Sequence, residues 1–360
     1  MNQRIVVVGG LAAGPSAASK AKRVNPGAQV ELLEQGEHIS YGICEIPYYV
    51  GDVFQDAGHL TVFTPERLER EKGVRVRTLH RVEEIHPHRK SLVVRDLEKN
   101  TESRIAYDRL ILATGSAPRT LNISGEKGRN VFTVKSLSDG LGMRKYVDEE
   151  SPRTAVIIGA GYIGMEMAEA LVRRGIRTTL IHRHDLPMAQ LERDASRTVL
   201  EILTLQGVSF VPNSEVRELP CDDTGKVVEV VTSTGRYPSD VVVLCIGVQP
   251  NAGLARQIGI RTGERGGILA DERQATSVGS IFAAGDCCEI RNAVNNRWMY
   301  IPLATYASRQ GWVAGENAAG GFATFKGAIR AIAVKVFDLE VAQVGLSVAE
   351  AESSGFDPVV

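Results

Sequence analysis

The chain has 360 residues and a formal net charge of -1 at pH 7, which is long enough for two or three domains of roughly 150 residues each. The balanced charge disfavours a nucleic-acid binder that relies on overall basicity, and 43% hydrophobic with 24% charged residues excludes a disordered or fibrous chain. No uncharged stretch reaches the roughly 18 apolar residues of a membrane span. We therefore expect a globular protein with neither nucleic acid nor membrane as a partner.

Five cysteines are spread through the chain, and no CxxC pair occurs. This odd, sparse set does not resemble a disulfide framework or a zinc ribbon, so we expect a reducing, cytoplasmic setting and no metal site. Cys245 lies in an apolar run, Cys221 in a polar turn, and the adjacent Cys287 and Cys288 are expected to pack in the core.

The first elements predict a nucleotide-binding unit. An apolar strand over 5–8 leads into the glycine turn 9–14, a helix over about 15–24 and a strand over 29–33. Such a turn brings the main chain close to a pyrophosphate at a helix N-terminus. Gly9 and Gly14 are in place, whereas Leu11 stands where the middle glycine belongs. Glu34, twenty residues after Gly14, suits a ribose hydroxyl.

The same pattern returns about 150 residues later. A strand over 154–158 runs into a complete GxGxxG at Gly159, Gly161 and Gly164, followed by a helix over 165–174 and a strand over 177–181. After this strand stand His182, Arg183 and His184 instead of a carboxylate. Because a carboxylate repels a 2′-phosphate while cations pair with one, we expect NADPH, with NADH as the alternative.

Three further apolar runs end in glycine turns, at 110–115, 240–247 and 280–286. Together with the doubled unit they predict an α/β fold with two Rossmann-like dinucleotide-binding domains.

Cys44 is the candidate nucleophile. It follows the first unit, and Pro47 three residues on is compatible with a helix that begins near Cys44. A helix N-terminus lowers the pKa of a thiol, although the adjacent Glu45 acts in the opposite direction. The alternative is a small buried hydrophobic residue, the usual fate of a free cysteine.

Seven ordered motifs resemble the pyridine nucleotide–disulfide oxidoreductase family, and among its members the coenzyme A-disulfide reductases, NADH oxidases, peroxidases and persulfide reductases. They are VVVGGLAAG from Val6, ISYGICEIPYY from Ile39, ILATGSAP from Ile111, VIIGAGYIGMEMAEAL from Val156, IFAAGD from Ile281, YIPLATYASRQG from Tyr300 and KVFDLEVAQVGL from Lys335.

The resemblance implies FAD in the first domain and a nicotinamide nucleotide in the second. It matches Asp286 to the family's FAD-binding Asp, Tyr162 to the tyrosine that gates the nicotinamide pocket, and Cys44 to the single redox-active cysteine. The cofactor-binding residues are then expected to be Gly9, Leu11, Gly14, Pro15, Glu34, Gln35, Val82, Ala113, Thr114, Gly115, Gly159, Gly161, Tyr162, Ile163, Gly164, Glu166, His182, Arg183, Gly247, Asp286, Pro302 and Leu303.

A lone cysteine implies a mixed disulfide, a persulfide or a sulfenic acid in the cycle, because no second cysteine lies near Cys44. The resemblance places coenzyme A, as substrate or mixed-disulfide adduct, at Arg23, Ser40 and Ile43. Many relatives have Asn at the position of Ile43 and a small residue at that of Glu45, so another small disulfide or persulfide stays open as the substrate.

The implied domains are an FAD domain over 1–115 and 246–324, an NAD(P)H domain over 116–245, and the start of an α+β dimerisation domain over 325–360. In relatives this last domain continues much further, contributes active-site tyrosines and forms a homodimer. We expect a homodimer of the full-length form, and an incomplete dimerisation domain here.

Three other functions compete with a disulfide or persulfide reductase. One is an oxidase or peroxidase that cycles Cys44 through sulfenic acid, against which Ala12 and Ala13 stand where peroxide-using relatives have a His. The second is an electron-transfer reductase for a protein redox carrier, which does not need Cys44. The third is a flavin-binding structural or signalling protein.

Overall fold

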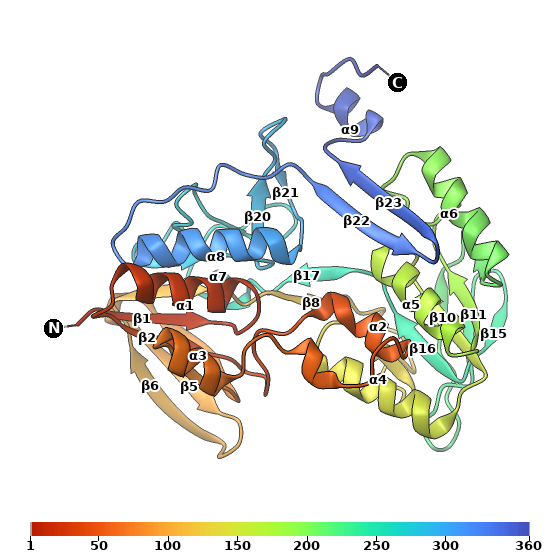
Figure 1. Cartoon of the computed structure of the whole chain (residues 1–360), viewed down its shortest axis with the longest axis horizontal. Coiled ribbons are helices and arrows are strands. Elements are labelled where there is room, and N and C mark those ends of the chain that lie inside the picture. The colour runs from red at the N-terminus through yellow and green to blue at the C-terminus, as the bar shows by residue number, and fades with distance from the viewer. Residues whose placement is uncertain (1, 360) are drawn as a thin grey trace. The chain divides into compact units, whose positions relative to one another are not determined.

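The computed structural model describes residues 2–359, which form two compact units (Figure 1). Unit 1 contains the chain up to Tyr41, Thr61–Ala117 and Val248–Ile329. Unit 2 contains Gly42–Leu60, Pro118–Gly247 and the chain from Arg330 onward. The two units are defined by contacts within the chain, whereas the predicted domains are defined by the nucleotide that each binds. The predicted domain boundaries therefore stay a prediction.

Unit 1 is built on a parallel five-stranded sheet. Its strand order is β19-β7-β1-β2-β3. The apolar runs predicted from the sequence form its centre, and they are buried on both faces as parallel strands usually are. The strands are β1 (Arg4–Val8), β2 (Gln29–Leu33), β3 (Arg75–Arg77), β7 (Arg109–Leu112) and β19 (Ile281–Ala283).

Two helices lie side by side over this sheet, α1 (Ala13–Val24) and α8 (Ala304–Ala318) (Figure 1). Glycines permit the close approach: a Cβ added at Gly311 would lie 2.2 Å from the carbonyl oxygen of Ala13, and one at Gly315 would lie 2.1 Å from that of Ala17. This packing holds α1, and therefore the glycine turn before it, against the sheet.

Smaller elements complete unit 1. They are α3 (Pro65–Lys72), the antiparallel sheet of β4 (His80–His86), β5 (Ser91–Asp96) and β6 (Thr101–Ala106), the pair of β8 (Ser116–Pro118) and β17 (Val248–Pro250), α7 (Gly253–Gln257), and the sheet of β18 (Ile268–Leu269), β20 (Cys288–Arg291) and β21 (Trp298–Met299).

Unit 2 repeats the parallel sheet in the order β12-β11-β10-β16-β9. Its strands are β9 (Val131–Thr133), β10 (Thr154–Ile158), β11 (Arg177–Ile181), β12 (Ser209–Val211) and β16 (Val241–Leu244). Its helices are α4 (Leu137–Glu150), α5 (Tyr162–Arg173) and α6 (Arg193–Leu205), and a second sheet contains β13 (Val216–Glu218), β14 (Glu229–Thr232) and β15 (Arg236–Pro238). The predicted α/β fold with two Rossmann-like units is confirmed.

Two outlying segments pack on the helices of unit 2. The first carries the 3-10 turns η1 (Ile43–Glu45) and η2 (Ala57–Leu60) and helix α2 (Ile46–Val50), which contacts α4 and α5. The second is the C-terminal hairpin β22 (Ala331–Val336) and β23 (Leu339–Val344) with α9 (Val348–Ser353); β22 contacts α5 and α6. Within residues 2–359 no helix is long and apolar enough to cross a membrane.

Candidate functional site

The first glycine turn is shaped for close packing. Gly9 has a φ of +114°, and a Cβ at Gly14 would lie only 1.8 Å from the carbonyl oxygen of Gly9. Neither position accepts another residue, and the N-terminus of α1 therefore lies directly at the end of β1. Leu11 is half-buried in the turn, and Pro15 is buried in the first turn of α1. A pyrophosphate suits the main-chain N–H groups of this turn.

Glu34 is fixed at the edge of the sheet beside this turn. Its Oε2 accepts a hydrogen bond from the N–H of Gly10 at 2.6 Å, and its Oε1 accepts one from Gly36 at 2.7 Å. A carboxylate oriented in this way keeps lone pairs for ribose hydroxyls. Gln35, the next predicted residue, is exposed.

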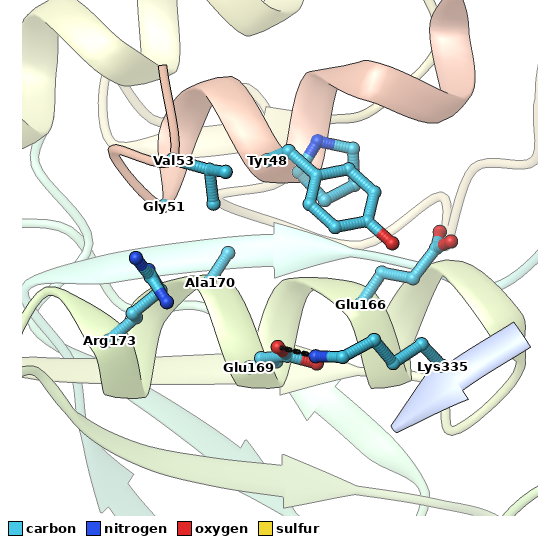
Figure 2. A pocket seen from close by; sticks show the side chains of 9 residues that line it. Tyr48, Gly51, Val53, Glu166, Glu169, Ala170, Arg173 and Lys335 are labelled. Carbon is cyan, nitrogen blue, oxygen red and sulfur yellow. Dashed lines mark hydrogen bonds and ion pairs between the residues drawn. The ribbon is translucent and has the colours of Figure 1, made fainter. Parts of the chain in front are cut away.

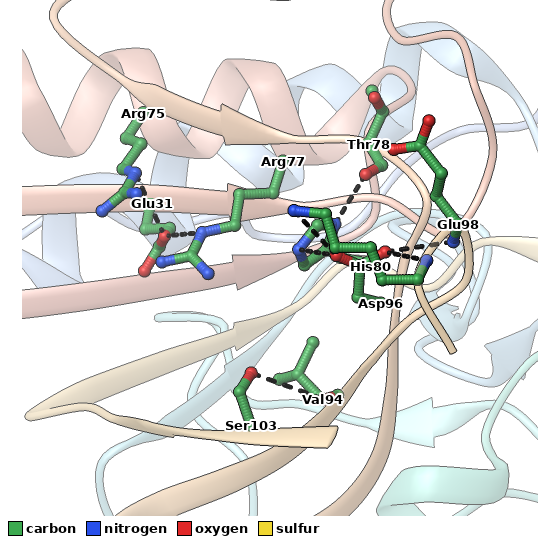
Figure 3. Close-up of polar contacts among 10 residues, drawn as sticks. Glu31, Arg75, Arg77, Thr78, His80, Val94, Asp96, Glu98 and Ser103 are labelled. Atoms are coloured by element: carbon green, nitrogen blue, oxygen red, sulfur yellow. Dashed lines mark hydrogen bonds and ion pairs between the residues drawn. The ribbon is translucent and has the colours of Figure 1, made fainter. Parts of the chain in front are cut away.

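Polar contacts link the strand ends next to Glu34, and Figure 3 shows those of Glu31 and His80. The N–H of His80 donates to the carbonyl oxygen of Glu34 at 2.8 Å, and the ring Nδ1 of His80 lies 2.7 Å from the carbonyl oxygen of Thr78. On neighbouring strands, Glu31 pairs with Arg77 at 2.6 Å. Val82 on β4 is 7% exposed and belongs to the core, so any nucleotide contact there falls to its backbone.

The turn after β19 carries Asp286, which accepts a hydrogen bond from the Ser116 hydroxyl at 3.2 Å. Gln310, buried on α8, accepts the N–H of Gly285 at 2.9 Å and so fixes this turn. Sequence reasoning did not single out Gln310, although it lies in the YASRQG motif, because only the fold shows that α8 returns to the turn.

The turn after β7 is tied down in a similar way. The Thr114 hydroxyl donates to the carbonyl oxygen of Asn251 at 2.6 Å, and the Asn251 amide donates back to that of Thr114 at 3.0 Å. Ala113 is buried, and Gly115 has a φ of +66° with open space beside it. Pro302 and Leu303 are half-buried immediately before α8, where Leu303 is the N-cap residue. Unit 1 therefore gathers its predicted carboxylates and glycine turns at the carboxyl ends of parallel strands, an arrangement that fits the ADP part of FAD.

The second glycine turn has the same construction in unit 2. Gly159 has a φ of +105°, and a Cβ at Gly164 would lie 2.1 Å from the carbonyl oxygen of Gly159. Gly161 is the N-cap of α5, and a Cβ there would meet nothing within 4 Å. This open space at a helix N-terminus fits the pyrophosphate of a nicotinamide dinucleotide. Ile163 is half-buried in the first turn of α5, and Gly247, after β16, has a φ of +91°.

His182 corrects one expectation. It is half-buried after β11, and its ring Nδ1 accepts a hydrogen bond from the N–H of Ala160 at 3.3 Å. Burial, together with the neighbouring His184 and Arg183, lowers the pKa of His182 to about 4. His182 is therefore neutral at pH 7 and offers no cation for a 2′-phosphate, whereas the guanidinium of Arg183 is exposed.

Cys44 lies in the turn η1, directly before α2, and the residue is exposed to solvent. The surrounding protein nevertheless raises the pKa of the thiol by desolvation, and the carboxylates of Glu166 and Glu45 raise it further. Lys135 and a main-chain hydrogen bond lower it by less. Of the two opposing influences expected from the sequence, Glu45 and burial outweigh the N-terminus of a helix of five residues, so the pKa of the thiol is raised.

The three predicted substrate-binding residues lie in different surroundings. Arg23 is exposed in the last turn of α1, and Ser40 is half-buried with a φ of +48°. Ile43 opens η1 and packs against the core of unit 2.

Three of the other four cysteines pack in the cores of the two units, and Cys221 is the exception. Cys287 and Cys288 are 0% and 1% exposed in the core of unit 1, as expected, and Cys245 packs against the core of unit 2. Cys221 is exposed, in a loop bridged to Val227. No group of His, Cys, Asp and Glu that suits a metal ion occurs among the described residues.

A small pocket lies between α2, α5 and β22 (Figure 2). Its first lining residue, Pro47, follows Cys44 by three positions in the sequence. Its wall contains Tyr48, Glu166, Glu169, Arg173 and Lys335. Burial raises the pKa of Glu166 to about 7, and the charge of Glu169 adds to this effect. Burial and the charges of both glutamates also raise the pKa of Tyr48. Sequence reasoning placed Glu166 at the cofactor but did not find Glu169 or Lys335.

Tyr162, one turn before Glu166 on α5, has a buried hydroxyl near the side chain of Gln190, whose hydrogen bond lowers the pKa of the phenol by less than burial raises it. Desolvation raises its pKa.

The chain is similar in sequence to known proteins over almost its whole length. It is 35% identical to the NAD(P)H sulfur oxidoreductase (CoA-dependent) of Pyrococcus abyssi over 99% of this chain and 78% of that protein. It is 30% identical to an NADH oxidase of Methanocaldococcus jannaschii over 96% of this chain and 76% of that protein.

Two solved structures share the fold closely. They are the reduced CoADR-RHD of Bacillus anthracis, at 33% identity and a TM-score of 0.94, and the NAD-dependent persulfide reductase of A. fulgidus, at 34% identity and a TM-score of 0.94. Each alignment covers 99% of this chain, but only 64% and 66% of the respective crystallised chains, so this chain spans less than two thirds of their length.

The family model of the pyridine nucleotide-disulphide oxidoreductases matches residues 3–311. Proteins of this family use FAD together with NAD(P)H. Since the match includes both glycine turns, Glu34, Cys44 and Asp286, the chain belongs to the pyridine nucleotide-disulphide oxidoreductase family and is an oxidoreductase.

Proposed function

We propose that this chain is an FAD-dependent NAD(P)H oxidoreductase that reduces a low-molecular-weight disulfide or persulfide through Cys44. The observation that best supports this proposal is the environment of Cys44. Among the described residues, Cys44 is the exposed cysteine whose pKa is raised by Glu166, which lies on the helix after the second glycine turn. Cys221 is exposed too, but it lies in an outer loop of unit 2.

Unit 1 supplies the groups for FAD. Glu34 would bind the adenosine ribose, the turn at Gly9 and Gly14 the pyrophosphate, and Asp286 the ribityl or phosphate region. When bound, FAD supplies two-electron transfer between NAD(P)H and sulfur. The proposed FAD domain is 1–115 with 246–324, and its other residues are Leu11, Pro15, Gln35, Val82, Ala113, Thr114, Gly115, Pro302 and Leu303.

Unit 2 supplies the groups for NADPH, over the proposed domain 116–245. The turn at Gly159, Gly161 and Gly164 would hold the pyrophosphate, and Tyr162 and Glu166 would face the nicotinamide end. The preference for NADPH rests on Arg183, which is exposed, and on the absence of a carboxylate after β11. Ile163, His182 and Gly247 complete this site.

The sulfur chemistry balances with one cysteine. The Cys44 thiolate attacks one sulfur of RS–SR′, the S–S bond breaks, and R′S⁻ leaves as R′SH after it takes a proton. Two electrons from NADPH then break the mixed disulfide and release RSH, and Cys44 returns as thiolate. The sum is NADPH + H⁺ + RSSR′ → NADP⁺ + RSH + R′SH.

Coenzyme A is the proposed thiol carrier, as substrate or as a mixed disulfide on Cys44. The Pyrococcus abyssi relative is named as CoA-dependent. Arg23 offers an exposed guanidinium for CoA phosphates, with Ser40 and Ile43 as further contacts. We also propose a homodimer, because residues 325–360 resemble the start of the family's dimerisation domain.

The NADH oxidase from Methanocaldococcus jannaschii supports a second candidate. In that case Cys44 would cycle through a sulfenic acid, with oxygen or peroxide as the acceptor. The two candidates differ in the product: one releases thiol, and the other consumes oxygen.

The decisive experiment is an anaerobic titration of the flavin-loaded protein with NADPH, in the wild type and in Cys44→Ser. We expect the wild type to take up one extra two-electron equivalent and to show a long-wavelength thiolate-to-flavin absorbance band. Cys44→Ser should show neither feature, because it cannot hold the mixed disulfide that accepts the extra electron pair. Flavin absorbance measures both quantities.

Cys221→Ser is the matched control, since it removes the other exposed cysteine and should titrate like the wild type. If wild type and Cys44→Ser titrate identically, Cys44 is not a redox centre and the electron-transfer function becomes the better one. In a separate aerobic assay with NADPH and a disulfide, oxygen uptake that exceeds thiol release would favour the oxidase.

A further inference from the structure

The short helix that follows Cys44 is held in place by charged groups at its carboxyl-terminal end. Cys44 lies in η1, and η1 runs into α2 without a loop between them, since the N–H of Ile46 donates to the carbonyl oxygen of Ile43. Helix α2 packs on α4 and α5 of the same unit (Figure 1). The position of α2 on these two helices therefore determines where the backbone of Cys44 lies.

We propose that Arg144, Asp148 and Arg174 are positioning residues for Cys44, because they fix the carboxyl-terminal end of α2 on the helices that carry them. We call these three residues the α2 clamp. The inference rests on the proposed function, since it adds positioning residues to the reaction of Cys44. Sequence reasoning singled out none of the three.

Two residues of the α2 clamp bind the main-chain carbonyl groups that end α2. Arg144 of α4 donates from Nη1 to the carbonyl oxygen of Tyr49 at 2.8 Å. Arg174, the C-cap of α5, donates from Nη1 to that of Val50 at 3.2 Å. The last carbonyl groups of a helix have no partner within the helix and carry its partial negative charge. The two guanidinium groups therefore match this end of α2 in both hydrogen bonding and charge.

Asp148 of α4 joins the two arginines. Its Oδ2 accepts a hydrogen bond from Nε of Arg144 at 2.7 Å, and its Oδ1 accepts one from Nη2 of Arg174 at 2.5 Å. Burial alone would raise the pKa of Asp148, but these hydrogen bonds and charges lower it, so the carboxylate is ionised at pH 7. Arg144 also pairs with Asp52, which follows α2, at 2.8 Å. The arginine side chains are only 14% and 18% exposed, which distinguishes the α2 clamp from a surface ion pair.

Close packing restricts α2 at both of its ends. Ile46, its first residue, is fully buried, and a Cβ added at Gly140 of α4 would lie 2.8 Å from Cγ2 of Ile46. A Cβ added at Gly51, the C-cap of α2, would lie 3.0 Å from the Cα of Ala170 on α5. Packing and the α2 clamp together therefore leave α2 a single position on α4 and α5.

The α2 clamp lies away from the second glycine turn. Gly161 of that turn is the N-cap of α5 and Arg174 is its C-cap, so a helix of 12 residues separates them. Such a helix is about 18 Å long. A change in the α2 clamp should therefore affect the step that uses Cys44 and spare the reaction with NADPH.

The first test compares the two half-reactions of the flavin-loaded enzyme in the wild type and in Asp148→Asn. Anaerobic stopped-flow absorbance follows flavin reduction by excess NADPH and, separately, reoxidation of the reduced enzyme by coenzyme A disulfide. We expect Asp148→Asn to leave flavin reduction unchanged. Reoxidation should slow by roughly 10- to 10²-fold, because a displacement of about 1 Å at a reacting atom costs that much. The thiolate-to-flavin absorbance band should weaken in the same variant.

Glu149→Gln is the matched control. It removes the same charge from the next residue of α4, where Glu149 forms an exposed ion pair with Lys145. Both half-reactions and the absorbance band should stay as in the wild type. Equal slowing of both half-reactions in Asp148→Asn, or no slowing, would overturn the proposal, and so would the same pattern in Glu149→Gln. The proposed function has its own outcome: it fails if Cys44→Ser is reoxidised by coenzyme A disulfide at the wild-type rate, whatever Asp148→Asn does.

The second test asks whether the α2 clamp acts as one unit. Arg144→Lys keeps the charge but loses the planar fork that reaches several acceptors at once, so it should slow reoxidation less than Arg144→Met does. The double variant Arg144→Met/Asp148→Asn should lose less than the product of the two single losses, because both changes break the same contacts. Losses that multiply, or an equal loss in Arg144→Lys and Arg144→Met with no change in the absorbance band, would overturn the positioning role.

Discussion

At the scale of the residue, the surroundings of Glu166 disfavour its ionised form and so raise its pKa. Its carboxyl group lies on a helix whose other face is core, and Glu169 stands close by with the same charge. A carboxyl group with a folded-state pKa near 7 and an ordinary value of 4.5 binds more protons in the folded protein than in the unfolded chain between these pH values. Its contribution to stability is therefore present below about pH 4.5 and is lost as the pH rises through 7.

We predict that Glu166→Gln is as stable as the wild type near pH 4.5 and more stable above pH 7, because Gln carries no charge that must be buried. The gain at high pH should reach up to roughly 3 kcal/mol. Urea unfolding at a series of pH values measures it. Glu149→Gln, which alters an exposed residue of α4, is the control. A difference between wild type and Glu166→Gln that stays constant with pH would contradict this account.

At the scale of the element, the pair α1 and α8 depends on residues without side chains. Gly311 and Gly315 let the backbone of α8 approach Ala13 and Ala17 to distances that no Cβ could tolerate. The same helix supplies Gln310 to the turn before Asp286. A change in this spacing would therefore reach the proposed FAD site as well as the core.

Gly315→Ala should lower the free energy of unfolding by about 2 kcal/mol or more and weaken FAD retention, because overpacking separates the helices. Gly142→Ala is a matched control: Gly142 lies within α4, and a Cβ there meets nothing within 4 Å. That variant should be slightly more stable, by roughly 0.5–1 kcal/mol. Thermal unfolding and flavin fluorescence measure both effects. Similar destabilisation by the two variants would show that helix spacing is not the cause.

Sequence patterns predicted some elements well and others poorly. The strands 29–33, 154–158 and 177–181 have the predicted bounds, because a buried parallel strand is a short apolar run between a turn and a helix. Helix α5 begins at Tyr162, three residues earlier than predicted, since its N-cap lies inside the glycine motif. The pKa of Cys44 and the partners of Glu169 depend on α5 and β22, which are distant in sequence, and no local pattern carries that information.

At the scale of the whole molecule, the two units repeat one design with different chemistry at one position. Glu34 follows β2 and accepts the N–H of Gly10; His182 follows β11 and accepts the N–H of Ala160. The two side chains thus make the same type of contact to their glycine turns. A carboxylate at the second position would recreate the first pattern and repel a 2′-phosphate.

We predict that His182→Glu lowers the ratio of kcat/KM for NADPH over NADH by at least about tenfold, because it places a negative charge where the 2′-phosphate would bind. Steady-state kinetics with both nucleotides measure this ratio. His184→Glu adds the same charge to an exposed residue nearby and should have a smaller effect. If both variants shift the ratio equally, the effect comes from net charge alone, and the position directly after β11 does not determine which nucleotide is preferred.

The segment that carries Cys44 has a consequence for how such proteins diversify. Residues 42–60 belong to unit 2 by their contacts, although unit 1 precedes and follows them in the chain. Genetic exchange of the stretch 118–247 alone would therefore leave behind both α2 and the hairpin from Arg330 onward. A recombinant that exchanges this stretch alone would have to pack the α4 and α5 of one protein against the α2 and C-terminal hairpin of another.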